Sequence, residues 1–366
     1  GDWGMRALSL FSGIGGLDLA AHAAGIETVA LCEIEPFAVQ VFERRFPAVE
    51  NHGDITRFTN RTLRELGGSP FHRFKCPADY NGTIDVVHGG FPCQDLSVAG
   101  KQRGLSGERS GLWYEMLRVI SELRPAYVVA ENVRGACNLA LPTVVSGLEG
   151  EGYEVRASVV PASAFGAPHK RERLFVLGVR RDVIVPVRDS IGSGKLWPTP
   201  RAGKTSDEKL DSWLARRERG EVATPPLSLA VKMWATPSSA DCKGSHGGGQ
   251  GRSLRTDIYN AGGGQLSPAW VECLMNFPLG WTDPDCDEPE PWPGWPAMMG
   301  ETQYPYEPPR TCKSIPNRAA RLKALGNSVV PAQAYPFFEA IAIMEEVRTQ
   351  CNQVPHPFPR EIMQYA

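Results

Sequence analysis

The sequence lacks the features that mark secreted, membrane-spanning and zinc-binding proteins. No apolar run approaches the roughly 18 residues needed to cross a bilayer, and no secretion signal opens the chain. Its 9 cysteines are an odd number without a Cys-x-x-Cys pair, which argues against a disulfide framework and against a zinc site. We therefore expect a soluble, cytoplasmic protein that holds no metal.

An excess of positive charge is also missing. The formal net charge is -2, so the chain as a whole exerts no electrostatic pull on nucleic acid. The total hides an uneven distribution, because residues 282–309 contain seven acidic side chains and neither lysine nor arginine, whereas positive charge gathers between residues 170 and 219. A polyanionic partner is therefore compatible with the composition.

The first 180 residues alternate short apolar segments with helical patterns, which is typical of a parallel sheet covered on both faces. Strands are expected at residues 7–11, 28–32, 84–88, 126–131, 155–160 and 173–179. Helices are expected between them at residues 15–25, 36–46 and 111–123. The pattern predicts an α/β fold with a doubly wound, mostly parallel sheet.

A second, smaller domain is expected where this alternation stops. From about residue 186 the chain is rich in Pro, Gly, Trp and Ser, and segments such as "GSHGGGQG" favour turns over regular elements. In "RAARLKALGNSVVPAQAYPFFEAIAIMEEV" regular periodicity returns, and we expect a turn followed by a helix. The predicted units are residues 5–185, an irregular domain at 186–311, a segment at 312–348 that returns to the first domain, and a tail at 349–366.

A glycine turn follows the first expected strand in "LSLFSGIGGLDLA". Gly13, Gly15 and Gly16 allow a ligand to approach the backbone at the start of a helix. Glu33 lies 20 residues beyond Gly13, where an acid can bind ribose hydroxyls, and Asp54 is expected at the end of the third strand. Such a turn alone often only joins a strand to a helix, but together with the spaced acid it favours a nucleoside-bearing cofactor.

A cysteine follows a proline in "GGFPCQDLS". Pro92 ends the expected strand, so Cys93 lies at the carboxyl end of a central strand, where open α/β sheets bind their ligands. Taken alone, an intracellular cysteine is more often a small buried hydrophobe than a nucleophile. The segment that follows, "CQDLSVAGKQRGLSGERSG", is too polar to pack in a core and is suited to fold over a phosphate backbone.

Two further segments supply groups for the same crevice. Glu131 ends the next strand in "VVAENV"; it is either a surface acid that caps a helix or a partly buried carboxyl group that can donate a proton. In "PHKRERLFVLG", Arg171 and Arg173 are two residues apart and are expected to point to one side of a strand. They form a solvated face, or they bind a base carbonyl or a phosphate.

Together these segments resemble the C5-cytosine DNA methyltransferases that use S-adenosylmethionine. Seven blocks occur in the order of that family: "LFSGIGG", the acid Glu33, "GDI", "GGFPCQDLS", "ENV", "HKRER" and "GNSVVP". The segment "LSPAWVECLMNFPLGWTD" is also similar to the end of the recognition domain in bacterial and phage members. Two residues depart from the family pattern: Ser9 stands where many members have an acid, and His169 stands where many have Gln. These departures put only local contacts in doubt. The resemblance implies a Rossmann-like class I methyltransferase.

The resemblance also implies a mechanism. The Cys93 thiolate adds to C6 of cytosine while Glu131 donates a proton to N3, Arg173 holds the cytosine O2, and Arg171 supports the pocket. The cytosine must leave the duplex, and the loop at residues 94–111 closes over the DNA. The DNA contacts implied on that loop are Gln94, Ser97 and Arg109.

The remaining family residues imply the site for S-adenosylmethionine, whose product is S-adenosylhomocysteine. The residues implied around its methionine and ribose are Phe11, Gly13, Ile14, Gly15, Gly16 and Glu33. Those at the adenine are Ile34, Asp54 and Ile55, and those that complete the pocket are Pro92, Leu112, Asn327 and Ser328. Residues 186–311 would then recognise the target sequence in the major groove, with base-reading candidates among Arg201, Lys204, Lys243, Arg252 and Arg255.

The implied partner is double-stranded DNA, without a membrane or a metal. We expect a monomer, because one chain holds every part of the implied site, and a restriction endonuclease of the same system would act without direct contact. A tRNA cytosine-5 methyltransferase is the first alternative, which the large inserted domain disfavours. A catalytically silent DNA-binding relative is the second, which the presence of Cys93, Glu131, Arg171 and Arg173 disfavours.

Overall fold

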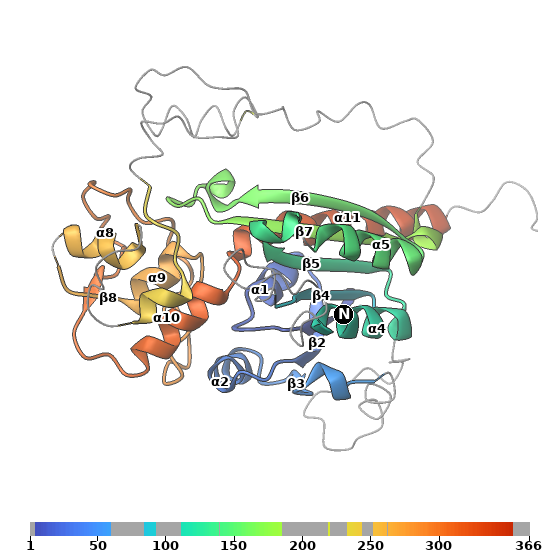
Figure 1. Cartoon of the computed structure of the whole chain (residues 1–366), viewed down its shortest axis with the longest axis horizontal. Coiled ribbons are helices and arrows are strands. Elements are labelled where there is room, and N and C mark those ends of the chain that lie inside the picture. Colours follow the sequence, from blue (N-terminus) through green and yellow to red (C-terminus); the bar gives the residue numbers. More distant parts are fainter. Residues whose placement is uncertain are drawn as a thin grey trace, which may run out of the picture.

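The computed structural model describes residues 4–59, 84–92, 111–138, 140–184, 219, 233–243, 252–261 and 263–353. Within them, one sheet has the strand order β3-β2-β1-β4-β5-β7-β6 (Figure 1). Its strands are β1 (Arg6–Leu10), β2 (Glu27–Cys32), β3 (Glu50–Asn51), β4 (Val86–Gly90), β5 (Tyr127–Val133), β6 (Tyr153–Pro161) and β7 (Glu172–Arg180). The first five strands of this order, from β3 at the edge to β5, are parallel to one another. Strand β7 runs antiparallel to both of its neighbours, β5 and β6. The predicted mostly parallel α/β sheet is therefore confirmed.

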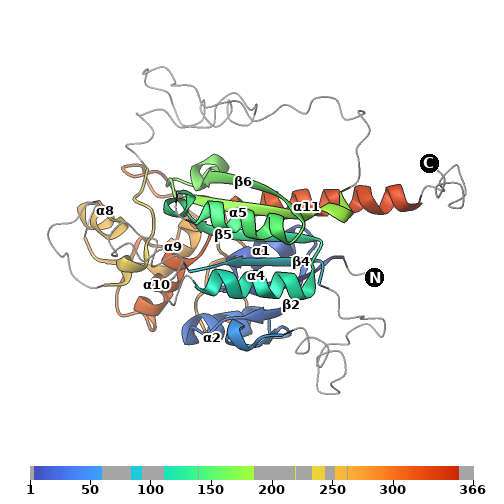
Figure 2. The ribbon, with the colours of Figure 1, turned by 45° about the vertical axis from the view of Figure 1, so that its right-hand side comes forward.

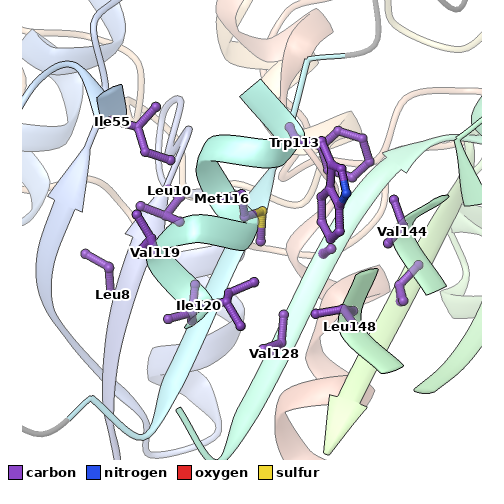
Figure 3. Close-up of a cluster of buried hydrophobic side chains, with 14 of the residues drawn as sticks. Leu8, Leu10, Ile55, Trp113, Met116, Val119, Ile120, Val128, Val144 and Leu148 are labelled. Carbon is purple, nitrogen blue, oxygen red and sulfur yellow. The ribbon is translucent and has the colours of Figure 1, made fainter. Parts of the chain in front are cut away.

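Helices cover both faces of the sheet, which explains why its central strands are almost uniformly apolar. On one face, Leu8 and Leu10 of β1 pack with Trp113 and Met116 of α4 (Gly111–Leu123) and with Leu148 of α5 (Leu141–Gly150) (Figure 3). The opposite face is covered by α1 (Gly16–Ala23) and α11 (Pro331–Gln353), which also contact each other. Figure 2 shows α4 and α5 on one side of the strands.

The chain reverses its winding direction between β1 and β4, which are neighbours in the sheet although β2 and β3 lie between them in the sequence. Ligands of open α/β sheets bind beyond the carboxyl ends of the strands at such a switch point. The glycine turn that follows β1 and the segment that follows β4 both start from this edge. The fold therefore brings together the two segments that the sequence analysis singled out.

The described residues 233–243, 252–261 and 263–330 are gathered at one end of the sheet, at the left of Figure 1. Their described elements are α8 (Leu254–Asn260), α9 (Pro268–Leu274), α10 (Arg318–Asn327) and the short antiparallel pair β8 (Gln265–Leu266) and β9 (Thr311–Cys312). Their core is shared with the first part of the chain, because Trp270 and Trp281 lie in one apolar cluster with Ile14 and with Val41 of α2 (Pro36–Arg45). The expected domain boundaries stay predictions, since residues 185–218 and 220–232 lie outside the described part.

One prediction about the C-terminal part is wrong. The segment that starts at Arg318 is not a turn followed by a helix but two helices, α10 and α11, separated by residues 328–330. Pro331 explains the break, because a proline disfavours helical dihedrals at the residue before it, whereas it fits the first position of a new helix.

In the part of the chain that the structure describes, no helix is both long enough and apolar enough to cross a membrane.

Candidate active site

The glycine turn after β1 has a conformation that side chains with a Cβ adopt rarely. Gly13 and Gly15 have φ angles of 55° and 81°, and the N–H of Gly15 donates to the Ser12 carbonyl at 3.0 Å. Within the described residues, the N–H groups of Ser12 and Ile14 have no hydrogen-bond partner. Ile14 is buried, so the turn presents the free N–H of the partly exposed Ser12 at the start of α1, as a site for a polar ligand requires.

Glu33, directly after β2, is fixed by the backbone on both sides. Its Oε2 accepts a hydrogen bond from the Gly13 N–H at 2.8 Å, and its Oε1 accepts one from the Ile34 N–H at 2.8 Å and one from the Glu35 N–H at 2.8 Å. Asn51 of β3 bridges the Glu33 backbone through its side-chain amide. A carboxylate so held has lone pairs left for ribose hydroxyls beside the turn.

The residues expected at the adenine differ in what they offer. Asp54 accepts a hydrogen bond from the Thr56 N–H at 2.9 Å, and this bond lowers the pKa of its carboxyl group, so Asp54 stays ionised. The Ile34 side chain is 69% exposed and directly follows Glu33. By contrast, the Ile55 side chain is only 4% exposed and packs in the core beside α4 (Figure 3). The structure thus offers a ligand the side chain of Ile34 but not that of Ile55.

The link between α10 and α11 closes the glycine turn from the other side. A Cβ on Gly16 would lie 2.7 Å from the Ser328 Oγ and 2.9 Å from the Val329 carbonyl oxygen, so only glycine allows this approach. Asn327, the last residue of α10, is exposed. Phe11 and Leu112 are partly buried against the core, and Pro92 is half-buried.

The carboxyl group of Glu131 lies at the same sheet edge, opposite the end of β4. Glu131 pairs in register with Gly90, and a Cβ on Gly90 would lie 2.9 Å from the Glu131 Oε2. The Glu131 Oε1 forms an ion pair with the Arg173 Nε at 2.8 Å, and the two side chains are 14% and 13% exposed. The next residue, Asn132, donates from its amide to the Phe91 carbonyl at 3.1 Å. Strand β5 therefore holds both the acid and the chain that leads to Cys93.

Burial and charge act in opposite directions on Glu131. Burial raises the pKa of its carboxyl group, whereas the positive charges of Arg173 and Arg171 lower it, and burial dominates. The result is a carboxyl group that protonates more readily than one in water while it keeps a fixed orientation. Such a group can donate a proton to a bound base.

The prediction that Arg171 and Arg173 share one side of a strand is wrong. Only Arg173 pairs within β7, and Arg171 precedes the strand with a φ of 28°. The buried Arg171 guanidinium instead donates to the Pro237 carbonyl at 2.6 Å, to the Gly326 carbonyl at 3.0 Å and to the Ser328 carbonyl. The sequence does not show at which residue an antiparallel strand begins to pair. The Arg171 side chain joins its own segment to Pro237 and to residues 326–328.

The comparisons with known proteins agree with this geometry. Residues 5–211 match the family model of C-5 cytosine-specific DNA methylases. The chain belongs to this family.

Curated type II methyltransferases match different shares of the chain. Type II methyltransferase M.NgoFVII of Neisseria gonorrhoeae is 35% identical over 211 residues, which cover 54% of this chain and 52% of that protein. Type II methyltransferase M.AquIA of Picosynechococcus is 34% identical over 256 residues, 63% of this chain and 95% of that protein. The chain spans 52%, 41% and 46% of the first three curated relatives, about half of their length.

A solved structure shows the same fold. The crystal structure of DNMT2 from Spodoptera frugiperda has a TM-score of 0.53 to this structure and 17% sequence identity, and the match covers 93% of this chain and all of that one. At this identity the likeness concerns the fold alone.

Several predicted site residues lie outside the described residues of this chain. They are Cys93, Gln94, Ser97 and Arg109, together with the base-reading candidates Arg201 and Lys204. Of the other candidates, Arg252 is bound to Asp257 at 2.9 Å and to the Met233 carbonyl, so its guanidinium is already used within the fold. In the described segments, no group of three or more His, Cys, Asp or Glu side chains could hold a metal ion.

The structure also shows contacts at the site that the sequence analysis did not find. Arg45 at the end of α2 binds the segment around Trp281, and the Trp281 indole reaches the glycine turn. The buried side chains of Glu272 and Arg321 form an ion pair, with 3.0 Å between the Glu272 Oε1 and the Arg321 Nη2. In this region the only sequence signal was the segment "LSPAWVECLMNFPLGWTD" (residues 266–283), which is similar to the end of the family's recognition domain. Nothing in the sequence pointed to Arg45.

Proposed function

We propose that the chain is a DNA (cytosine-5-)-methyltransferase, which transfers a methyl group from S-adenosylmethionine to C5 of a cytosine flipped out of a specific duplex sequence. The observation that carries this proposal is the partly buried Glu131–Arg173 pair, which faces the end of β4 two residues before Pro92. The family match supports it.

The cytosine must be activated before its C5 can accept a methyl group. The Cys93 thiolate forms a bond to C6, Glu131 donates its proton to N3, and the ring becomes an enamine with a nucleophilic C5. Arg173, whose Nε pairs with Glu131, is proposed to bind the cytosine O2 as well. After methyl transfer, loss of the C5 proton and departure of the thiolate restore the aromatic ring.

The residues around the glycine turn fit S-adenosylmethionine. We propose that the Ser12 N–H binds the polar tail, that the fixed carboxylate of Glu33 binds the ribose, and that the exposed Ile34 side chain contacts the base. Asp54, Pro92, Leu112 and Ser328 are proposed to complete the site, with Asn327 next to them. When bound, the cofactor supplies an electrophilic methyl group to the edge of the sheet where Glu131 lies.

The DNA is proposed to lie across this edge. Because C5 and C6 are covered within a duplex, the target cytosine must rotate out of the helix. Residues 94–111, with Gln94, Ser97 and Arg109, are proposed to close over the phosphate backbone, and residues 186–311 to read the sequence. We propose that a single chain suffices, that it acts in the cytoplasm, and that any restriction endonuclease of the same system works without touching it.

Bisulfite sequencing tests the proposal and returns the specificity in the same experiment. The protein is incubated with S-adenosylmethionine and a DNA of diverse sequence, and protected cytosines are expected in one short context. Total tRNA is incubated in parallel, since methylation of tRNA alone would favour the alternative substrate. If neither nucleic acid gains protected cytosines, the proposed activity is wrong.

A second arm tests the nucleophile. A duplex with 5-fluorocytosine at the identified target cannot lose fluorine as it loses a proton, so the wild-type protein should form a covalent adduct that survives denaturing electrophoresis. The Cys93→Ala variant should form none. Methylation by Cys93→Ala at the wild-type rate would contradict the assignment.

A further inference from the structure

Trp281 reaches from the segment after α9 to the glycine turn. Its indole N–H donates to the Ile14 carbonyl at 2.8 Å, across 267 residues of sequence. Ile14 is 1% exposed and Trp281 is 6% exposed, so water does not compete for this bond. A buried hydrogen bond of this kind is costly to leave unmade.

The segment that carries Trp281 is itself held rigidly. The Arg45 guanidinium donates to four of its carbonyls: Trp281 at 2.8 Å, Cys286 at 2.7 Å, Gly280 at 2.6 Å and Asp283 at 2.8 Å. From the other side, Glu272 accepts hydrogen bonds from the N–H groups of Gly280 and Thr282, both at 2.8 Å. The Trp281 indole is therefore a fixed donor, because its own backbone cannot move away from α2.

The peptide that it holds is one that could otherwise rotate. The Ile14 carbonyl belongs to the peptide group between Ile14 and Gly15, and Gly13 and Gly15 have positive φ angles. Glycine adopts several backbone conformations at little cost, so a turn with glycine on both sides of Ile14 has alternatives. The bond from Trp281 restrains this peptide in the conformation of the structure, in which the N–H of the partly exposed Ser12 has no partner among the described residues.

We propose that Trp281 is a positioning residue for the methyl-donor site, which holds the glycine turn in its binding conformation before the ligand arrives. The inference rests on the proposed function in one respect, that S-adenosylmethionine binds at this turn. A site that is formed in only a fraction of the molecules binds its ligand more weakly by that fraction. Loss of the Trp281 bond should therefore weaken cofactor binding even though Trp281 is placed behind the turn.

Trp281→Phe removes the N–H and keeps an aromatic ring, and Trp234→Phe is its matched control. Trp234 lies in the same apolar cluster and its indole donates to the Ala297 carbonyl, also at 2.8 Å, but away from the turn. Binding of S-adenosylhomocysteine to the full chain without DNA is measured by isothermal titration calorimetry. We expect Trp281→Phe to bind about five to ten times more weakly than wild type, and Trp234→Phe to stay within about twofold.

Steady-state kinetics separate positioning from chemistry. The KM for S-adenosylmethionine should rise in Trp281→Phe by a similar factor, while kcat at saturating cofactor stays near the wild-type value, because Cys93 and Glu131 are untouched. Equal weakening in both tryptophan variants would show that Trp281 acts only through core packing, and would overturn the inference. A wild-type protein that binds no S-adenosylhomocysteine would instead refute the proposed cofactor site.

Arg45→Lys gives a second route if Trp281→Phe does not fold. Lysine cannot donate to four carbonyls at once, so the segment around Trp281 should loosen while the indole remains. The affinity for S-adenosylhomocysteine should fall by a smaller factor, about twofold to fivefold. An unchanged affinity in a folded Arg45→Lys variant whose melting temperature has dropped would overturn the inference.

Discussion

Gly90 at the end of β4 lies directly opposite Glu131 on β5, and a Cβ on Gly90 would come within 2.9 Å of the Glu131 Oε2. The absent side chain leaves the space into which the carboxylate extends, while Arg173 binds the other carboxylate oxygen. The position of the acid is thus determined by three adjacent strands. This arrangement makes the activity sensitive to changes of a single methyl group.

Gly90→Ala should lower kcat and leave cofactor binding intact. The added methyl group pushes the carboxylate out of line with Arg173, and a misplaced proton donor loses much of its contribution, about 10-fold to 100-fold. Gly150→Ala is the control, because a Cβ there has no atom within 4 Å. Methylation rates at saturating cofactor decide the matter, and an unaltered kcat in Gly90→Ala would mean that the Glu131 position is not critical.

Glu131→Gln should abolish most of the activity without unfolding the protein. The amide retains a hydrogen bond to Arg173 but has no proton to transfer to N3, and loss of a positioned acid costs about 10²-fold to 10⁴-fold in rate. Glu172→Gln changes the neighbouring carboxylate, which pairs with Arg134 and Lys170, and should retain most of the rate. Rates are measured by transfer of labelled methyl groups to DNA, and full activity in Glu131→Gln would exclude it as the acid.

Arg171→Lys should reduce stability more than it reduces kcat. Lysine cannot donate to the carbonyls of Pro237, Gly326 and Ser328 together, and at least one buried carbonyl is then left without a partner, at about 1–3 kcal/mol. The free energy of unfolding in urea is the readout. Arg173→Lys provides the contrast, since it should lower kcat more than stability. The reverse order of effects would show that Arg171 acts on the reaction more than through the carbonyls that it binds.

The sequence predicted the features that depend on neighbouring residues in the chain, such as the apolar strands. Central strands buried on both faces are continuous apolar runs, so β1, β4 and β5 could be predicted. The prediction that Glu131 ends its strand is wrong, because β5 continues to Val133, and Asn132 and Val133 still pair with β7. The contacts of Arg171 and Trp281 could not be predicted, because their partners lie 155 and 267 residues away and are backbone carbonyls, which every residue possesses. Ile55 shows the same limit, since a family position does not reveal whether a side chain faces a ligand or the core.

The buried His169 should make the protein less stable as the pH falls. Its Nε2 is 2.8 Å from the Leu274 carbonyl, and burial lowers its pKa from 6.5 to about 3, so the folded protein keeps it neutral. The unfolded chain takes up a proton near pH 6.5. Because the folded pKa is depressed, the stability that His169 contributes is complete above about pH 6.5 and is lost as the pH falls toward 3, by about 2 kcal/mol at pH 5.

His169→Gln tests this dependence, because Gln can donate to the same carbonyl and does not titrate. The free energy of unfolding in urea is compared at pH 7.5 and pH 5 for both proteins. Wild type should lose about 2 kcal/mol more than the variant between these values. His88, whose pKa is also lowered by burial, is present in both proteins, so the difference isolates His169. Equal losses would mean that His169 is protonated in the folded state at pH 5, against the effect of its burial.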